Sequence, residues 1–358
     1  MSGDARVRLA LPGKGALEAA TLAFLAECGL KVSRSNPRQY LARMKSLPEM
    51  EVVFQRAADI PSLVQSGDAA FGITGYDILA EHRGGDDELD EDDHDETLMV
   101  MLRDLGYGNC RLVIAVPETW IDVSNCADLW HLAGYYQAHK RRGLRIATKY
   151  PILTGNFLRR HSITHCKIFS PHGALEAAPL TDTADLIVDL TETGTTLREN
   201  HLKLLDDGTV LRSQATLIGN ARLLRRDPLA LKVAETLLEL IDARMQAKNR
   251  SMLTAHLHGE SIEAMQHLCV QINQRLNTAS PDSAFRILTA ETTDQTAPGW
   301  YTLSGVVSVG DSAFELLETV AVLRRAGAIH ISITPLTYRF AEEPMSVRML
   351  RERLARVN

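Results

Sequence analysis

The segment from Ala184 to Asn200 constrains the fold more than any other part of the chain. It reads Ala-Asp-Leu-Ile-Val-Asp-Leu-Thr-Glu-Thr-Gly-Thr-Thr-Leu-Arg-Glu-Asn. Leucine, isoleucine and valine dominate its first half, which is typical of a buried strand. A turn rich in hydroxyl groups follows, and a helix can begin directly after it. We therefore predict a strand, a tight loop and a helix in that order.

The polar residues of this segment suggest an anion site. Asp185 and Asp189 are four residues apart, so they share one face of the predicted strand, where we expect them to act together. The loop combines a glycine that tolerates positive φ, three hydroxyl donors and the first N–H groups of a helix, which bind anions without a lysine. It consists of Thr193, Gly194, Thr195, Thr196 and Leu197. An ordinary threonine-capped helix has the same sequence pattern.

Length and charge limit the possible functions. The 358 residues are enough for two or three domains at about 150 residues each. Of the 45 acidic residues, nine lie between Asp86 and Glu96, and the other 36 nearly balance the 39 basic ones. A near-neutral body without a basic stripe does not favour nucleic acid as a partner.

The cysteines and the apolar segments predict the compartment. Five scattered cysteines show no paired zinc spacing, which fits a reducing compartment. Met1 to Lys14 lacks the apolar stretch of a signal peptide, and no run of about 18 apolar residues is present to span a membrane. We expect a cytoplasmic protein.

Short apolar segments alternate with helical patterns along the first two thirds of the chain, which predicts an α/β fold. Leu112–Val116 is apolar throughout, as expected for a strand buried on both faces. Further strands are predicted at residues 6–11, 52–54, 70–73, 98–102, 145–148, 166–169 and 184–190.

The last third predicts a different module. A helix from Asp227 to about Lys248 separates it from the preceding part. The predicted order is strand, helix, strand, strand, helix, strand, which is ferredoxin-like. These elements span residues 251–257, 261–276, 284–290, 301–309, 312–326 and 330–336. Two other segments, Gly84–Glu96 and Trp130–Gly143, are interpreted as solvated insertions.

Several separated segments resemble the ATP phosphoribosyltransferase family, in the order in which that family has them. The loop Thr193–Leu197, called the threonine loop below, and the preceding segment Gly173–Pro179 are similar to the family's site for phosphoribosyl pyrophosphate (PRPP). The other matching segments are Leu9–Gly15, Asp59–Asp77, Gly108–Leu112, Arg145–Pro151 and Ser213–Ile218. The resemblance covers about residues 6–220 strongly and residues 251–340 only in element order.

The resemblance implies a catalytic part with two lobes, like periplasmic solute-binding proteins, and a C-terminal regulatory domain. Lobe I would comprise residues 1–107 and 207–248, and lobe II residues 108–206. The ferredoxin-like domain would cover residues 249–340, and a helical tail residues 341–358. Long family members are inhibited by histidine and resemble dimers that assemble into hexamers.

The implied reaction joins adenine N1 of ATP to C1′ of PRPP, with loss of pyrophosphate and with Mg²⁺ held by the substrate. The threonine loop would hold the 5′-phosphate. Asp185 or Asp189, together with Glu176, would bind the ribose hydroxyls. The residues assigned to ATP or to phosphate oxygens are Lys14, Arg56 and Asp77.

Two departures from the family pattern matter. Lys14-Gly15-Ala16 lacks the arginine that many members have at the third position. The strand Ser251–His256 lacks the acidic residue that some long forms use to hold the amino group of histidine. The first departure weakens the assigned phosphate contact, and the second puts feedback inhibition in question.

The sequence leaves two other functions open. A two-lobed binding or regulatory protein without catalysis is one alternative, and a phosphoribosyltransferase with another base acceptor is the other. The second alternative usually has two adjacent acids before the loop, where this chain has Asp189-Leu190. His256 and His258 are interpreted as ordinary strand histidines, and Cys110 as a structural thiol.

Overall fold

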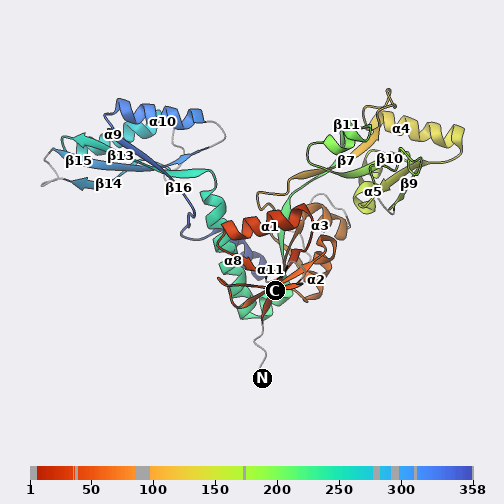
Figure 1. The fold of residues 1–358 in the computed structure, drawn as a ribbon, viewed down its shortest axis with the longest axis horizontal. Coiled ribbons are helices and arrows are strands. Elements are labelled where there is room, and N and C mark those ends of the chain that lie inside the picture. Colours follow the sequence, from red (N-terminus) through yellow and green to blue (C-terminus); the bar gives the residue numbers. More distant parts are fainter. Residues whose placement is uncertain are drawn as a thin grey trace, which may run out of the picture. The chain divides into compact units, whose positions relative to one another are not determined.

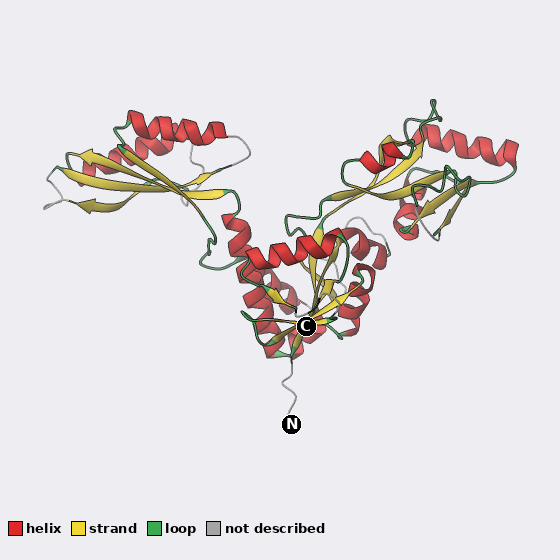
Figure 2. Cartoon of the chain, viewed as in Figure 1, coloured by secondary structure: helices red, strands yellow, loops and turns green. Residues whose placement is uncertain are grey.

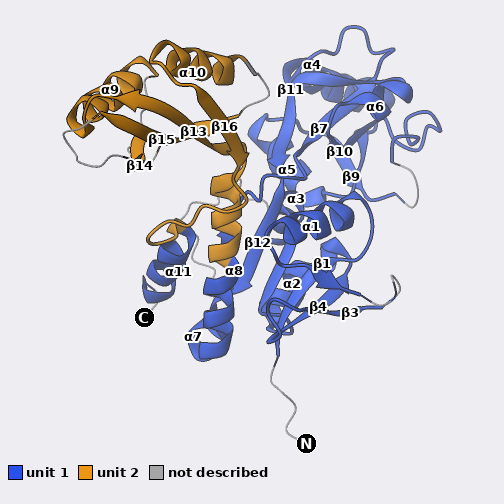
Figure 3. Cartoon of the chain, turned by 60° about the vertical axis from the view of Figure 1, so that its left-hand side comes forward, with its two compact units in different colours: residues 1–237, 346–358 blue, residues 238–345 orange. Residues whose placement is uncertain are grey.

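The structure is a computed structural model, and it describes residues 6–34, 36, 39–84, 97–171, 175–276, 283–291, 298–309 and 313–356. The chain divides into two units, which Figure 3 distinguishes by colour. Unit 1 comprises residues 1–237 and 346–358, and unit 2 comprises residues 238–345. The predicted acidic insertion lies outside the described residues except for Gly84, and so do Gly173 and Ala174.

Lobe I of unit 1 is built on a seven-stranded sheet (Figure 1). The three strands β4, β1 and β5 are parallel, so their carboxyl ends meet at one edge. The sheet order is β2 (Val32–Ser33), β3 (Leu41–Met44), β4 (Met50–Gln55), β1 (Val7–Pro12), β5 (Phe71–Gly75), β12 (Ala215–Asn220) and β6 (Leu98–Leu102). The helices are α1 (Ala16–Glu27), α2 (Ile60–Ser66), α3 (Tyr76–His82) and α7 (Ala221–Arg226), with one short 3₁₀ turn at Ala57–Asp59.

Lobe II is built on a five-stranded sheet. Its order is β11 (Leu202–Ser213), β7 (Cys110–Pro117), β10 (Leu186–Thr191), β8 (Leu144–Thr148) and β9 (Cys166–Phe169). Strands β10, β8 and β9 are parallel, whereas β7 runs antiparallel to β10. The helices are α4 (Cys126–Tyr135), α5 (Pro151–Arg160) and α6 (Thr195–Glu199). Residues 112–116 of β7 are all buried, as the unbroken apolar run predicts.

The predicted boundary at Asp207 is wrong, because β11 continues in the lobe II sheet to Ser213. Asp206, Asp207 and Gly208 look like a turn in the sequence. In the structure they form an irregularity within the strand, since the register with β7 shifts between Leu204 and Thr209. The chain returns to the lobe I sheet with β12.

Trp130–Gly143 is mostly helical, so its interpretation as a solvated loop is also wrong. Asn125 and Asp128 form a capping box that starts α4, and a π-helical turn continues from Tyr136 to Lys140. Ala133 and Tyr136 are buried in the core of unit 1. The capping box is a sequence signal that could have revealed this helix.

Unit 2 has the predicted ferredoxin-like order, with the sheet β14-β15-β13-β16. Both helices cover the same face of this sheet (Figure 2). Leu253, Ala255 and Leu257 point into the core beneath them, while the alternating residues of the same strand are more exposed. The elements are β13 (Arg250–Gly259), α9 (Ile262–Arg275), β14 (Arg286–Glu291), β15 (Gly299–Ser308), α10 (Ala313–Arg325) and β16 (His330–Pro335).

The C-terminal helix belongs to unit 1 and is not a separate tail. Helix α11 (Met345–Arg356) contacts lobe I, where Arg353 Nη1 donates to the carbonyl oxygen of Val100 at 2.6 Å. Arg351 pairs with Glu235 at 2.7 Å. Glu235 lies on α8 (Pro228–Ala247), the predicted helix that passes from one unit to the other. No helix among the described residues has the length and apolar content needed to cross a bilayer.

Candidate active site

The carboxyl end of β10 carries the predicted loop. Asp189 is partly buried in the strand, and its Oδ1 accepts a hydrogen bond from the N–H of Leu190 at 2.8 Å. Gly194 adopts a left-handed conformation with φ of 79°, and α6 begins at the next residue. A side chain at this φ would be strained, which explains the glycine. The predicted strand, loop and helix are all present.

The loop is held by its own threonines. The Thr191 hydroxyl accepts from the N–H of Gly194 at 2.8 Å, and the hydroxyls of Thr193 and Thr195 lie 2.9 Å apart. Thr193, Thr195 and Thr196 are exposed. The first N–H groups of a helix have no acceptor within that helix, so α6 presents donors beside these hydroxyls.

Leu197 contributes differently from the other loop residues. Its side chain is buried in a small core that includes Leu202 and Ile187. Only its backbone N–H is therefore available to a ligand, whereas its side chain anchors α6 against lobe II. The prediction that Leu197 binds substrate applies to its backbone alone.

Charges of both signs surround Asp189. Burial is the largest influence on Asp189 and raises its pKa. The hydrogen bond from the N–H of Leu190 and the positive charge of Lys149 lower the pKa, and the negative charge of Glu176 raises it. The net result is a pKa above the ordinary value. Lys149 directly follows β8, which runs parallel to β10, and Thr148 pairs with Val188. Lys149 was not predicted as a site residue, although it lies within the segment Arg145–Pro151.

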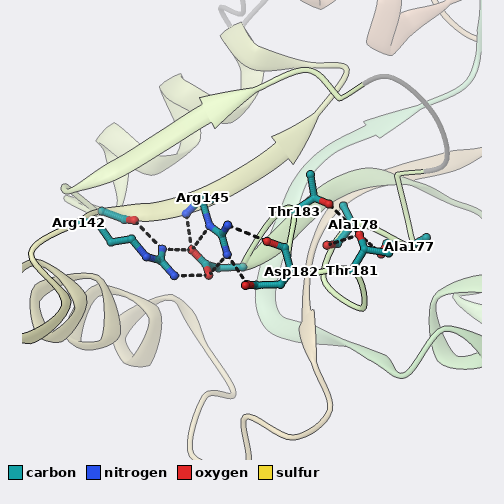
Figure 4. A network of polar contacts seen from close by, with 9 residues as sticks. Arg142, Arg145, Ala177, Ala178, Thr181, Asp182 and Thr183 are labelled. Atoms are coloured by element: carbon teal, nitrogen blue, oxygen red, sulfur yellow. Dashed lines mark hydrogen bonds and ion pairs between the residues drawn. The ribbon is translucent and has the colours of Figure 1, made fainter.

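Asp185 lies at the other end of β10, so the prediction that it acts together with Asp189 is wrong. Four residues of a strand separate the two by roughly 13 Å. Asp185 is 8% exposed and is enclosed by two arginines, with Arg142 Nη1 at 2.5 Å from Oδ2 and Arg145 Nη2 at 3.0 Å from Oδ1. Arg145 also pairs with Asp182 at 2.6 Å (Figure 4).

These contacts explain the ionisation of Asp185. Burial alone would raise its pKa, but hydrogen bonds from the side chains of Arg142 and Arg145 and from the N–H of Arg145 outweigh that effect, and the pKa falls well below its usual range. Asp185 is thus an ionised group that is saturated by protein donors. It joins the start of β8 to the start of β10.

Lys14 and Arg56 follow two neighbouring strands at the carboxyl edge of the lobe I sheet. Lys14 follows β1 and Arg56 follows β4, in a register that places Pro12 opposite Gln55. The N–H of Gly13 donates to the carbonyl oxygen of Gln55 at 2.7 Å, which extends this pairing. Both cationic side chains are exposed.

Asp77 connects the two lobes. It is 3% exposed, and its carboxylate accepts from Ser213 Oγ at 2.5 Å and from Tyr150 Oη at 2.6 Å. Burial, the charge of Asp77 and this hydrogen bond raise the pKa of Tyr150, so the phenol remains protonated. Because both carboxylate oxygens are engaged, contact of Asp77 with ATP requires one of these hydrogen bonds to open.

Glu81 makes a second connection from the same helix. Its two carboxylate oxygens accept from the N–H groups of Ile152 and Leu153 at 2.8 and 2.9 Å. These are the first N–H groups of α5, where a negative charge is favourable. Asp77 and Glu81 are one turn apart on α3 and hold the turn that carries Lys149 and Tyr150. Neither contact is evident from the sequence.

A cysteine and a surface hollow are the two remaining features, and neither is assigned a role in substrate binding. Burial, and to a smaller extent the charge of Asp77, raise the pKa of Cys110 to about 11, so it is a neutral thiol, as predicted. A hollow of about 600 Å³ lies at the amino edge of β1, between Arg8, Glu51 and Asp227. It contains none of the predicted site residues.

Comparison with known proteins agrees on one family. The family model for ATP phosphoribosyltransferase matches residues 56–263. The chain is 35% identical over 344 residues to "ATP phosphoribosyltransferase 2, chloroplastic" of Arabidopsis thaliana, covering 95% of this chain and 79% of that relative. It is 32% identical over 331 residues to "ATP phosphoribosyltransferase" of Rhodopseudomonas palustris strain BisB18, covering 92% and 93%.

A solved structure is also similar. It is the ATP phosphoribosyl transferase complex (HisG:HisZ) from Thermotoga maritima, with 26% identity and a TM-score of 0.48. The match covers 66% of this chain and 98% of that one.

Proposed function

The chain belongs to the ATP phosphoribosyltransferase family, which are pentosyltransferases of histidine biosynthesis, and on that premise we propose the reaction and the residues that perform it. The reaction transfers the phosphoribosyl group of PRPP to N1 of the adenine of ATP. It releases pyrophosphate and inverts the anomeric carbon. The product is N1-(5-phosphoribosyl)-ATP.

The loop after β10 holds the 5′-phosphate of PRPP. The observation that carries this proposal is the convergence of Thr193, Gly194 and Thr195 with a helix start and with Asp189 at one strand end. The exposed hydroxyls and backbone N–H groups are donors for phosphate oxygens. A phosphate there places the ribose near Asp189.

Asp189 and Glu176 act on the ribose. Departure of pyrophosphate builds positive charge on the ring, and two nearby carboxylates stabilise that charge more in the transition state than in the ground state. The contacts of Asp189 support this role, because its carboxylate accepts a main-chain hydrogen bond at Oδ1 only, from the N–H of Leu190, and keeps acceptor capacity for ribose hydroxyls. Asp185 has no place in this step, since its oxygens are occupied by arginines.

Lys149, Lys14 and Arg56 serve the phosphates. Lys149 stands next to Asp189 at the carboxyl edge of the lobe II sheet, and the other two stand at the carboxyl edge of the lobe I sheet. Cations there balance the charge of pyrophosphate and of the ATP triphosphate. Asp77 is the remaining candidate for contact with ATP, after a hydrogen bond to it opens.

Catalysis uses positioning and electrostatics without a covalent enzyme intermediate. The neutral Cys110 thiol is consistent with this, because a thiol nucleophile would need a lowered pKa. PRPP enters as its Mg²⁺ complex, in which the cation is held chiefly by pyrophosphate and ribose oxygens. The cation offsets charge on the leaving group.

Unit 2 is proposed as the regulatory domain. Its βαββαβ fold is compatible with a small-molecule sensor, and histidine is the candidate inhibitor of a dimer that assembles into a hexamer. The strand β13 carries Ser251 and no acidic residue up to His256. Any histidine site must therefore use another group for the amino end. No disulfide joins the five cysteines, which supports a reducing compartment such as the cytoplasm.

The test is product formation by the purified full chain. It is incubated with ATP, PRPP, Mg²⁺ and a pyrophosphatase, and the ultraviolet absorbance of N1-ribosylated adenine is followed with and without histidine. We expect product that requires both substrates. Binding of ATP or PRPP without product would favour the non-catalytic binding protein, and product with another base would favour a different acceptor.

A further inference from the structure

Three elements of lobe II bring a cysteine, a histidine and an aspartate together, away from the residues assigned to PRPP. Cys126 is the first residue of α4, His161 directly follows α5, and Asp207 lies in the irregular part of β11. One ligand atom from each lies within 4.8 Å of the others. The three residues are 35 and 46 positions apart in the sequence, so only the fold assembles them.

The arrangement is held from both sides. The N–H of Cys126 donates to Asp207 Oδ1 at 2.8 Å, which places the carboxylate beside the start of α4. The ring of His161 packs against Phe157, one turn earlier, with ring centroids 4.3 Å apart. Cys126 is buried, while His161 and Asp207 are exposed, so the cluster has a solvent-facing side through which an ion can enter.

The geometry points to a site for a divalent transition-metal ion of the zinc class, and we propose that Cys126 Sγ, one ring nitrogen of His161 and a carboxylate oxygen of Asp207 are its three protein ligands. Sulfur and imidazole ligands exclude Mg²⁺ and Ca²⁺, which prefer oxygen. Three protein ligands and one water complete a tetrahedron.

The distances require a small adjustment. Bonds of about 2.0 to 2.3 Å in a tetrahedron place ligand atoms roughly 3.5 Å apart. The side chains of His161 and Asp207 therefore move by about 1 Å toward Cys126 when the ion binds. Both are exposed and can make that movement, whereas Cys126 stays fixed by the core.

The alternative is a buried thiol that only hydrogen-bonds. In that case the Cys126 thiol donates to the main-chain carbonyl oxygen of Asp207, with Sγ 3.8 Å from that oxygen. A divalent ion would displace the thiol proton and bind the sulfur together with a carboxylate oxygen of Asp207. The ion would connect α4, α5 and β11, and it would stabilise lobe II by mass action.

The experiment uses metal-stripped full-length protein and Co²⁺ as the spectroscopic probe, because cobalt bound to a thiolate gives a charge-transfer band in the near ultraviolet. We expect one equivalent of Co²⁺ to give this band, Zn²⁺ to displace it, and Zn²⁺ to raise the melting temperature. His161→Gln is expected to weaken Co²⁺ binding about tenfold or more, and Cys126→Ser to abolish the band.

The controls separate this site from other ligands. Cys166→Ser and His131→Gln alter the same residue types in lobe II outside the cluster and should keep the band. His256 faces His330 across two strands, with ring centroids 6.2 Å apart, so His256→Gln tests that pair as the source. A wild-type protein without the band, or a band that survives in His161→Gln and Cys126→Ser, would overturn the proposal. The readout is independent of transferase activity.

Discussion

The two ends of β10 carry the same side chain in opposite surroundings. At the amino end, two arginines saturate Asp185 and its pKa falls below the usual range. At the carboxyl end, burial raises the pKa of Asp189, and one backbone donor and the charge of Lys149 offset this rise only in part. The first carboxylate is held by protein donors, whereas the second is the one that we propose acts on the ribose. Position along the strand, and not residue type, gives the two aspartates their different surroundings.

The strongest test of this contrast is Asp189→Asn. The amide keeps the shape but removes the charge that we propose stabilises the ribose cation, so we expect kcat to fall by about 10² to 10³-fold. The melting temperature should not fall, because a carboxylate with a raised pKa costs stability at neutral pH. Steady-state assays and thermal melts measure both quantities. A variant that keeps more than a tenth of wild-type kcat would remove Asp189 from the mechanism.

Thr195→Val probes the loop beside Asp189. The substitution removes a hydroxyl that faces the proposed phosphate and changes little of the side chain's volume. We expect KM for PRPP to rise about tenfold, which corresponds to about 1.4 kcal/mol, with a smaller change for ATP. Thr289→Val, at an exposed position of β14 in unit 2, is the matched control. Equal KM values for the two variants would contradict the assignment of the loop.

Asp185→Asn tests the amino end of the strand. It leaves Arg142 and Arg145 without their shared carboxylate, and we expect a loss of about 1 to 3 kcal/mol in the free energy of unfolding. This expected loss is smaller than the loss for a fully buried ion pair, because both arginines are partly exposed. The value of kcat should stay within about twofold. Urea denaturation and the same assay decide this, and a large loss of kcat with unchanged stability would return Asp185 to the active site.

The smallest expected effect is the pH dependence of the difference in unfolding free energy between wild type and Asp185→Asn. Because the folded pKa of Asp185 is lowered, its stabilising contribution is complete above its unfolded pKa, near 3.9, and decreases as the pH falls below about 4. The stabilities of wild type and Asp185→Asn should therefore differ by a constant amount above about pH 5 and converge progressively as the pH is lowered below about 4. Asp189→Asn should show the opposite sign, because protonation of Asp189 on acidification stabilises the wild type. Parallel curves for Asp185→Asn would show that the ion pair is not the source.

Local patterns were sufficient for much of the fold. The apolar run Leu112–Val116 is a strand buried on both faces, and the helix predicted from Asp227 separates the two units. The prediction failed where tertiary contacts override composition. The polar stretch Asp206–Gly208 remains inside β11 because β7 provides a partner across a bulge. Trp130–Gly143 is helical because Ala133 and Tyr136 reach the core.

By itself, the sequence determined the family, the order of the elements and the loop after β10, because each depends on a short run of residues whose spacing shows in one dimension. Only the tertiary structure decided how the carboxylates are used. The alternation of side chains along a strand predicts which face a side chain occupies. It does not predict that Arg142 forms an ion pair with Asp185. It also does not predict that Asp77, on α3 of lobe I, accepts a hydrogen bond from Tyr150. Partners distant in sequence set the local charge, and that charge separates a structural carboxylate from one that can act on a substrate.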